Sequence, residues 1–212
     1  MTKTEREERM RAQLEAMLSY ERALWAKGTA RIGGVDEVGR GPLAGPVCAA
    51  CVILPQDWDV PGVNDSKKLS EKRRAELYGV IAERAISYGI GLVGPARIDE
   101  INILNATKEA MLAAVRHLSA PPDHLLVDAL KLPEAGIPGT AIVKGDEKSV
   151  SIAAASILAK VTRDRIMIEL DSVYPGYGFA RNKGYGTEEH YAGLRKLGPT
   201  PLHRRSFLKN LL

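Results

Sequence analysis

Two apolar runs with a glycine- and proline-rich turn between them constrain the fold of this chain most. The first run covers residues 31–37 and ends on two adjacent carboxylates, Asp36 and Glu37. The second covers residues 46–54 and has the composition of a buried strand. A connection this short implies antiparallel pairing. The sequence therefore predicts a pair of neighbouring strands, the first of which carries two carboxylates at its end.

The rest of the pattern predicts an α/β domain built on one mixed sheet of five strands. The three further strands are predicted at residues 86–93, 124–128 and 140–143. Helices are predicted at residues 70–84, with Ser70 as N-cap, and at residues 98–118, 149–171 and 187–197, with a short one at the C-terminus. The helix at 149–171 is rich in alanine, so we expect it to lie close to the sheet.

Residues 5–26 predict one amphipathic helix that Gly28 ends. Two placements remain open for it: it packs on the sheet, or it projects as an accessory arm. We accordingly divide the chain into an N-terminal helical extension, residues 1–28, and a main domain with C-terminal helices, residues 29–212.

Carboxylates lie at or just beyond the ends of three predicted strands, as Asp36 with Glu37, Asp128 and Asp146. Side chains at the ends of neighbouring strands can converge, because the strands lie about 4.8 Å apart. Four such carboxylates would repel one another unless hard divalent cations lay between them. Two ions can together support hydrolysis of a phosphodiester. The alternative is that these are turn and cap residues, for which Asp is common. Asp164, on the predicted helix at 149–171, is at best a residue that helps to hold a metal ion through water.

The turn after Glu37 is a tight hairpin turn, and its backbone is also open to contact with a nucleic acid. Gly39 and Gly41 leave the main chain free to approach a sugar, whose 2′-OH distinguishes RNA from DNA, and Arg40 suits a phosphate. Lys67 and Lys183 lie in loops interrupted by serine or glycine, and we expect them to contact phosphates. The cluster at residues 72–74 is predicted to be a solvated helix face instead.

Residues 35–46 resemble the signature of type 2 ribonucleases H, specifically bacterial ribonuclease HII. Six further blocks follow in family order, at residues 64–70, 126–128, 143–146, 153–160, 183–187 and 203–207. The resemblance implies the ribonuclease H fold, with Asp36, Glu37, Asp128 and Asp146 as catalytic ligands of two Mg²⁺ or Mn²⁺ ions. It also implies that Tyr185 contacts the substrate together with Gly39, Arg40, Gly41, Lys67 and Lys183.

The activity that the resemblance implies is endonucleolytic. We expect cleavage of the RNA strand of RNA·DNA hybrids and of single ribonucleotides embedded in duplex DNA, 5′ to the ribonucleotide, leaving 3′-OH and 5′-phosphate. Ribonucleotide excision repair and RNA primer removal would be its roles. The alternatives are a catalytically silent hybrid-binding module, or a ribonuclease HIII-like enzyme. The second is disfavoured because only about 30 residues precede the first motif, too few for a substrate-binding domain.

Composition and the remaining motifs exclude several other classes. Cys48 and Cys51 fall on opposite faces of a buried strand, so we predict core residues rather than a redox or zinc site. The four histidines have no metal-binding spacing. The net charge of +4 permits nucleic-acid binding without establishing it. No apolar run suits a membrane span or a signal peptide, so a cytoplasmic protein is expected. We also expect a monomer.

Overall fold

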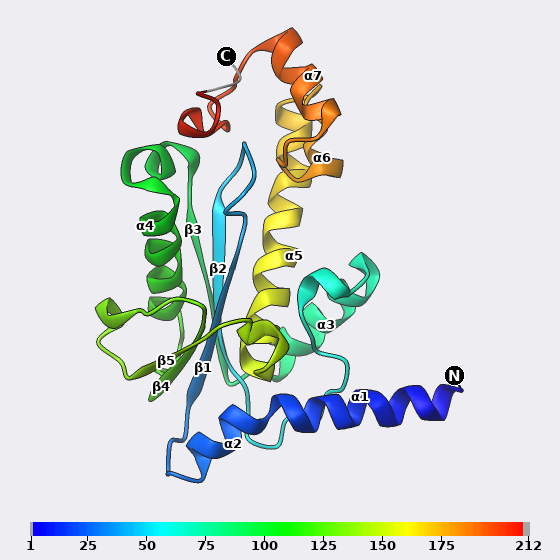
Figure 1. Cartoon of the computed structure of the whole chain (residues 1–212), viewed down its shortest axis with the longest axis vertical. Coiled ribbons are helices and arrows are strands. Elements are labelled where there is room, and N and C mark those ends of the chain that lie inside the picture. The colour runs from blue at the N-terminus through cyan, green and yellow to red at the C-terminus, as the bar shows by residue number, and fades with distance from the viewer. Residues whose placement is uncertain (1, 210–212) are drawn as a thin grey trace.

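A five-stranded mixed sheet in the order β3-β2-β1-β4-β5 forms the centre of the computed structural model, which describes residues 2–209 (Figure 1). Its strands are β1 (Ile32–Val38), β2 (Val47–Ile53), β3 (Ser87–Val93), β4 (His124–Asp128) and β5 (Gly139–Ile142). The pairs β1–β2 and β2–β3 are antiparallel, whereas β1–β4 and β4–β5 are parallel. The predicted strands, the mixed sheet and the antiparallel first pair are confirmed.

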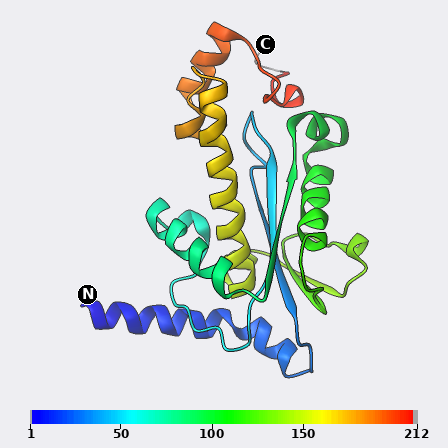
Figure 2. The ribbon, with the colours of Figure 1, turned by 180° about the vertical axis from the view of Figure 1, so that it is seen from behind.

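Helices cover both faces of the sheet. They are α1 (Lys3–Met17), α2 (Ser19–Trp25), α3 (Glu71–Arg84), α4 (Pro95–Arg116), α5 (Val150–Val173), α6 (Phe179–Asn182) and α7 (Glu188–Leu197). The described residues also form short 3₁₀ turns, which are η1 (Ser66–Lys68), η2 (Pro133–Ala135), η3 (Gly145–Glu147) and η4 (Arg205–Phe207). Figures 1 and 2 show α4 on one face and α5 with α3 on the other. Within residues 2–209, no helix combines the length and hydropathy that a membrane span requires.

The two faces of β2 separate the two cysteines as predicted. Cys48 belongs to the core beneath α5 and α3, and Cys51 to the core beneath α4; both are free and buried. Burial raises the pKa of the Cys48 thiol to about 12, opposed by the charge of Arg163. Burial also raises the pKa of the Cys51 thiol. The thiols are therefore uncharged core groups.

Helix α5 lies close to the sheet because small residues occupy both sides of the contact. A Cβ atom on Gly34 of β1 would stand 2.1 Å from the backbone carbon of Ser151, so only glycine fits there. Residues 153–155 of α5 are three buried alanines. Ser70 and Thr187 cap α3 and α7 as N-caps, and the predicted positions of these helices and of α5 are confirmed. The short C-terminal helix is instead the 3₁₀ turn η4, and α6 was not predicted.

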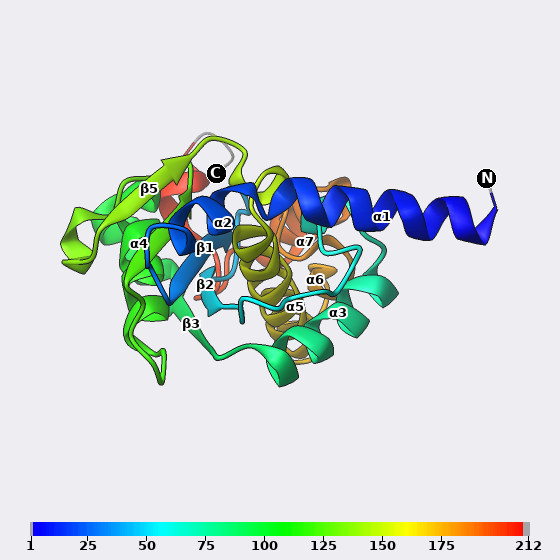
Figure 3. The same ribbon diagram turned by 90° about the horizontal axis from the view of Figure 1, so that it is seen from below.

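The predicted N-terminal helix is wrong in one respect, because it is two helices that meet at Leu18. This turn lets Leu18 enter the core while Glu21 of α2 reaches the first turn of α5. There the buried Glu21 carboxylate accepts hydrogen bonds from the Ser149 hydroxyl (2.6 Å) and the Ser151 N–H (3.0 Å). Figure 3 shows the other end of α1 projecting beyond the body. The division at residue 28 stays a prediction, and residues 1 and 210–212 of it lie outside the described chain.

Candidate active site

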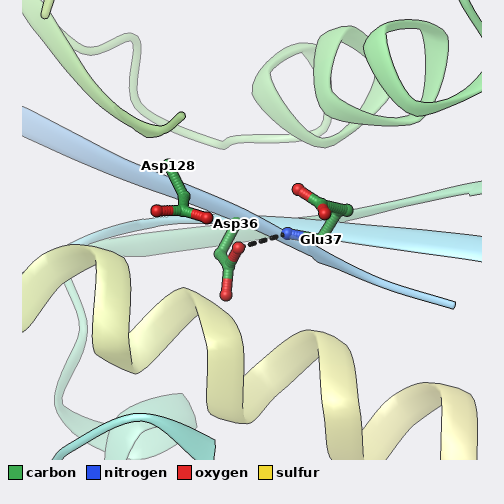
Figure 4. A group of neighbouring side chains, drawn as sticks. All are labelled: Asp36, Glu37 and Asp128. Carbon is green, nitrogen blue, oxygen red and sulfur yellow. Dashed lines mark hydrogen bonds between the residues drawn. The ribbon is translucent and has the colours of Figure 1, made fainter. Parts of the chain in front are cut away.

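Three carboxylates meet where β1 and β4 part. Asp36 and Glu37 lie on β1 and Asp128 ends β4, and one oxygen from each lies within 4.8 Å of the others (Figure 4). The parallel ladder between the strands ends at Val35 and Val127. Asp36 and Asp128 are the next residues after that pair, so the carboxylates lie together at the end of the ladder.

The backbone of β1 does not bend at Glu37 to bring the two adjacent carboxylates onto one face. The β1–β2 ladder stays in register through Val38, with Asp36 opposite Ala50 and Glu37 opposite Ala49. The two side chains therefore leave opposite faces of the strand, as strand geometry requires. The Glu37 N–H donates to Asp36 Oδ1 (2.8 Å), which orients that carboxylate (Figure 4). The longer glutamate side chain reaches the group without a bulge, and Arg40 pairs with it at 3.7 Å.

Asp146 lies next to this group but is not one of the three residues within 4.8 Å. It is buried in η3, whose Gly145 N–H donates to Asp128 Oδ1 at 2.6 Å. Burial raises the pKa of the Asp146 carboxyl, and the charges of Asp65 and Asp128 raise it further. The two elements that carry Asp128 and Asp146 are thus joined directly, and the role of Asp146 as a ligand stays a prediction.

The pKa values of the clustered carboxyls are raised, so their negative charges are not fully compensated by neighbouring groups of the protein. Burial raises the pKa of the Asp36 carboxyl well above its ordinary value, and the charges of Glu37 and Asp128 add to this, while a hydrogen bond with Ser156 lowers it. The pKa of Glu37 is also raised, mainly by burial, against the lowering effect of Arg40. A buried, all-oxygen group of this kind fits a hard divalent cation, because the cation would relieve both the burial and the repulsion.

Lys67 and Asp65 complete the charged surroundings. Burial would lower the pKa of Lys67, but the charges of four carboxylates raise it: Asp65, Asp146, Asp36 and Asp128. These four carboxylates are therefore close enough to stabilise the charged form of Lys67. Sequence reasoning missed Asp65, which is buried and accepts from the Lys67 N–H (2.9 Å), although it lies in the same matched block. Ser156 was not among the predicted site residues either; it bonds Asp36 and lies 2.9 Å from the buried Ser66 hydroxyl.

Asp164 is accounted for by its own helix. Its carboxylate pairs with Lys160, four residues earlier on α5, at 2.7 Å. Asp164 is not a member of the three-carboxylate group. Its neighbour Arg163 turns away from it to backbone carbonyls.

Two fully buried arginines, Arg163 and Arg204, hold the glycine-rich loop that follows β1. Sequence reasoning missed both roles. The guanidinium of Arg204 donates to the carbonyls of Gly39 (2.6 Å), Arg40 (2.9 Å) and Gly45 (2.9 Å). That of Arg163 donates to the carbonyls of Pro46 (2.8 Å), Ala44 (3.1 Å) and Lys183 (2.9 Å). A Cβ on Gly39 (φ +91°) would stand 2.2 Å from Arg163 Nε, so the loop conformation requires glycine there.

Tyr185 lies beside this loop and is 42% exposed, so it is not a core tyrosine. A Cβ on Gly41 would meet the Tyr185 ring at 3.8 Å. Its neighbour Gly184 accepts from the Leu43 N–H at 2.8 Å, which joins the two loops. Lys183 has φ +53° and its ammonium donates to the Ala180 carbonyl. The structure thus brings the predicted substrate residues of both loops together, while their contacts with a substrate stay predictions.

Two buried histidines lie behind the Tyr185 backbone, in the small core that α6, α7 and the C-terminal segment form. His190 Nε2 and His203 Nε2 are 3.0 Å apart, and stacked rings of Tyr177 and Phe179 pack against both imidazoles. Burial lowers the pKa of His203 to about 4, and the proximity of His190 lowers it too. Burial also lowers the pKa of His190. Both imidazoles are neutral at pH 7.

We expect the melting temperature to fall as the pH decreases from about 6.5 towards 4. The pKa of His203 is about 4 in the folded chain against 6.5 ordinarily, so the unfolded chain binds more protons in this interval. His203 alone would cost about 3 kcal/mol of the free energy of unfolding by pH 4. The raised carboxyl pKa values act in the opposite sense. Melting curves of the wild type and His203→Asn between pH 7 and 4.5 isolate the histidine, because the variant should lose less stability on acidification. Equal losses would contradict this.

Comparison with known proteins places these features in one family. The ribonuclease HII family model matches residues 33–210. Ribonuclease HII of Clostridioides difficile strain 630 is 58% identical over 199 residues, which are 94% of this chain and 78% of the relative. That of Acetivibrio thermocellus is 59% identical over 196 residues, 92% and 77% respectively. A PCNA:RNase HII complex from Archaeoglobus fulgidus gives a TM-score of 0.71 at 29% identity and covers 86% of this chain and 96% of that one.

Proposed function

The chain belongs to the ribonuclease HII family and is a ribonuclease H endonuclease, and from this premise we propose what it cuts and how. Its substrates are RNA·DNA hybrids and single ribonucleotides embedded in duplex DNA. It cleaves 5′ to the ribonucleotide and leaves 3′-OH and 5′-phosphate, which serves ribonucleotide excision repair and RNA primer removal. The observation that carries the proposal is the group of Asp36, Glu37 and Asp128 within 4.8 Å, beside the loop at residues 39–41.

Asp36, Glu37, Asp128 and Asp146 would hold two Mg²⁺ or Mn²⁺ ions. When bound, the ions supply an activated water and stabilise the leaving 3′ oxygen. The residues themselves keep the site ready for this chemistry. The Glu37 N–H and the Gly145 N–H fix Asp36 and Asp128 through one carboxylate oxygen each. Asp128 therefore keeps a second oxygen for a ligand, whereas the Asp36 carboxylate also bonds the Ser156 hydroxyl.

Substrate recognition rests on the loops that face the carboxylates. Arg204 binds the carbonyls of Gly39 and Arg40, so the backbone that approaches the ribose is held before substrate arrives. Backbone groups can contact a 2′-OH without selecting a base. Lys67 stands close to the carboxylates and suits the scissile phosphate. Membership of the family disfavours both alternatives, the silent binding module and the ribonuclease HIII-like enzyme.

The deciding experiment is cleavage of three duplexes by the purified chain, with Mg²⁺ and with Mn²⁺. One duplex carries a single ribonucleotide in DNA, one is a long RNA·DNA hybrid, and one is all DNA. We expect cleavage of the first two only, with a cut 5′ to the embedded ribonucleotide. Cleavage of the long hybrid but not of the duplex with one embedded ribonucleotide would refute the proposed specificity. Activity after complete chelation of divalent cations would refute the proposed role of the metal ions.

We expect Lys67→Ala and Lys183→Ala each to weaken binding to every duplex. Each variant should also lower the slope of log K against log salt by about one, because one phosphate contact is lost. Lys72 is exposed on α3 in the cluster predicted to be solvated, and Lys72→Ala is the matched control. Binding should be measured without metal, at several salt concentrations. A slope equal to that of the control would show that the lysine contacts no phosphate.

A further inference from the structure

We propose that His190 and His203 are positioning residues that fix how Tyr185 is presented to the substrate. The inference rests on the proposed function, because Tyr185 is a substrate contact only there. The two histidines touch neither the carboxylates nor any exposed surface: His190 is 0% and His203 2% exposed. What they do contact is the backbone of the Tyr185 loop and the segment that anchors the glycine-rich loop.

The hydrogen bonds of the pair admit one arrangement of protons. The Thr200 N–H donates to His203 Nδ1 at 2.9 Å, so Nδ1 is an acceptor and the proton of His203 lies on Nε2. That proton is donated to His190 Nε2 at 3.0 Å. The proton of His190 must then lie on Nδ1, where it is donated to the Tyr185 carbonyl at 2.9 Å. A directed chain therefore runs from Thr200 through both imidazoles to the Tyr185 backbone.

Tyr185 needs such a restraint because of its neighbours. It lies between Gly184 (φ +85°) and Gly186, and glycine allows many backbone conformations. The Tyr185 carbonyl accepts from the Thr187 N–H (2.9 Å) as well as from His190. The bond from His190 is the one that ties this carbonyl to the buried core. It holds the peptide plane from which the exposed ring projects beside Gly41.

His203 connects the same chain to the other recognition loop. His203 and Ala44 form an isolated antiparallel bridge, and the next residue, Arg204, donates its N–H to the Leu43 carbonyl at 2.8 Å. The Arg204 guanidinium binds the carbonyls of residues 39, 40 and 45. The segment 203–204 therefore sets the position of the ribose-contacting loop and, through His190, that of Tyr185. The two loops keep a fixed spacing, which recognition of an RNA-to-DNA junction requires.

Two substitutions at His190 separate positioning from packing. In His190→Asn the amide nitrogen lies near the place of Nδ1 and can still donate to the Tyr185 carbonyl. In His190→Gln the amide lies near the place of Nε2, so it keeps a partner in His203 and loses Tyr185. Both variants shorten or reshape the same buried side chain, so both should lower the melting temperature. The discriminating readout is the ratio of kcat/KM on the embedded ribonucleotide to kcat/KM on the long hybrid.

We expect His190→Gln, which loses the bond to the Tyr185 carbonyl, to lower this ratio about tenfold, because small misplacement of a recognition group is costly. His190→Asn keeps that bond and loses only the orienting bond to His203, so it should lower the ratio clearly less. Tyr185→Ala is measured alongside. If Tyr185→Ala lowers the ratio and His190→Gln does not, the positioning role is wrong and the proposed function stands. If Tyr185→Ala leaves the ratio unchanged, the proposed contact of Tyr185 fails, and the positioning role fails with it.

Should His190→Gln not fold, His203→Asn decides. Its amide can keep the Thr200 bond, but it loses the donor to His190. We expect a retained fold and a lowered ratio, because the imidazole of His190, which donates to the Tyr185 carbonyl, loses the bond that orients it. An unchanged ratio in a folded His203→Asn protein would overturn the proposal.

Discussion

Asp128→Asn is expected to abolish cleavage in saturating Mg²⁺ while the fold stays intact. Loss of one ligand of a two-ion site should cost at least about 10³-fold in turnover, about 4 kcal/mol of transition-state stabilisation. Asn keeps the acceptor for the Gly145 N–H, which now bonds Asp128 Oδ1 at 2.6 Å, so η3 should stay in place. Asp36→Asn should behave alike, since its amide oxygen can still accept from the Glu37 N–H.

The stability of these variants without metal gives a second, independent readout. The pKa of Asp36 is raised by burial and by its neighbours, so the ionised group destabilises the folded chain above that pKa. Removing one charge should therefore leave the metal-free melting temperature unchanged or raise it. Mn²⁺ should raise the melting temperature of the wild type and have much less effect on Asp128→Asn, because ligand binding stabilises only a folded chain that binds it.

Glu147→Gln is the matched control for these variants. Glu147 follows Asp146 in η3, but it pairs with Lys68 at the surface (2.9 Å) and does not belong to the three-carboxylate group. Its activity should stay near that of the wild type. Near-wild-type cleavage by Asp128→Asn in saturating Mg²⁺ would show that the assignment of the metal ligands is wrong.

The strands and their carboxylates could be predicted because periodicity and composition are local signals. The apolar runs that end on Asp36 and Asp128 indicated that both residues follow the apolar part of a strand. The two strands are parallel neighbours, which brings the two carboxylates together. Asp146 is harder to place because η3 is a turn whose position depends on the bond between Gly145 and Asp128. Periodicity says nothing about how far such a turn carries its side chain towards the group.

Buried arginines and histidines could not be predicted in the same way. Arg163 and Arg204 look like surface charges in sequence, and their partners are loop carbonyls as far as 119 and 165 residues away. His190 and His203 lack metal-binding spacing, which correctly excluded a metal role, but the bond between them exists only once α7 and the C-terminal segment pack together. The break at Leu18 was not predicted either, because no glycine or proline marks it in the sequence.

The exposed ring of Tyr185 supports a prediction about the nucleotide that follows the ribonucleotide. The glycine-rich loop can report a 2′-OH, but it cannot explain why the next sugar should be deoxyribose. A tyrosine ring against that sugar or base gains about 1–3 kcal/mol by stacking, and a 2′-OH there would crowd it. The ring lies beside Gly41, so both contacts can be made at adjacent positions of one strand.

Tyr185→Ala should therefore lose roughly five- to 150-fold more activity on a single embedded ribonucleotide than on a long hybrid. The melting temperature should change little, because the side chain is 42% exposed. Tyr185→Phe is the matched control: it keeps the ring and should keep the preference. Steady-state kinetics on both substrates, with melting curves of all three proteins, test this. Equal losses on the two substrates, or a large fall in melting temperature, would show that Tyr185 supports the loop rather than reading the junction.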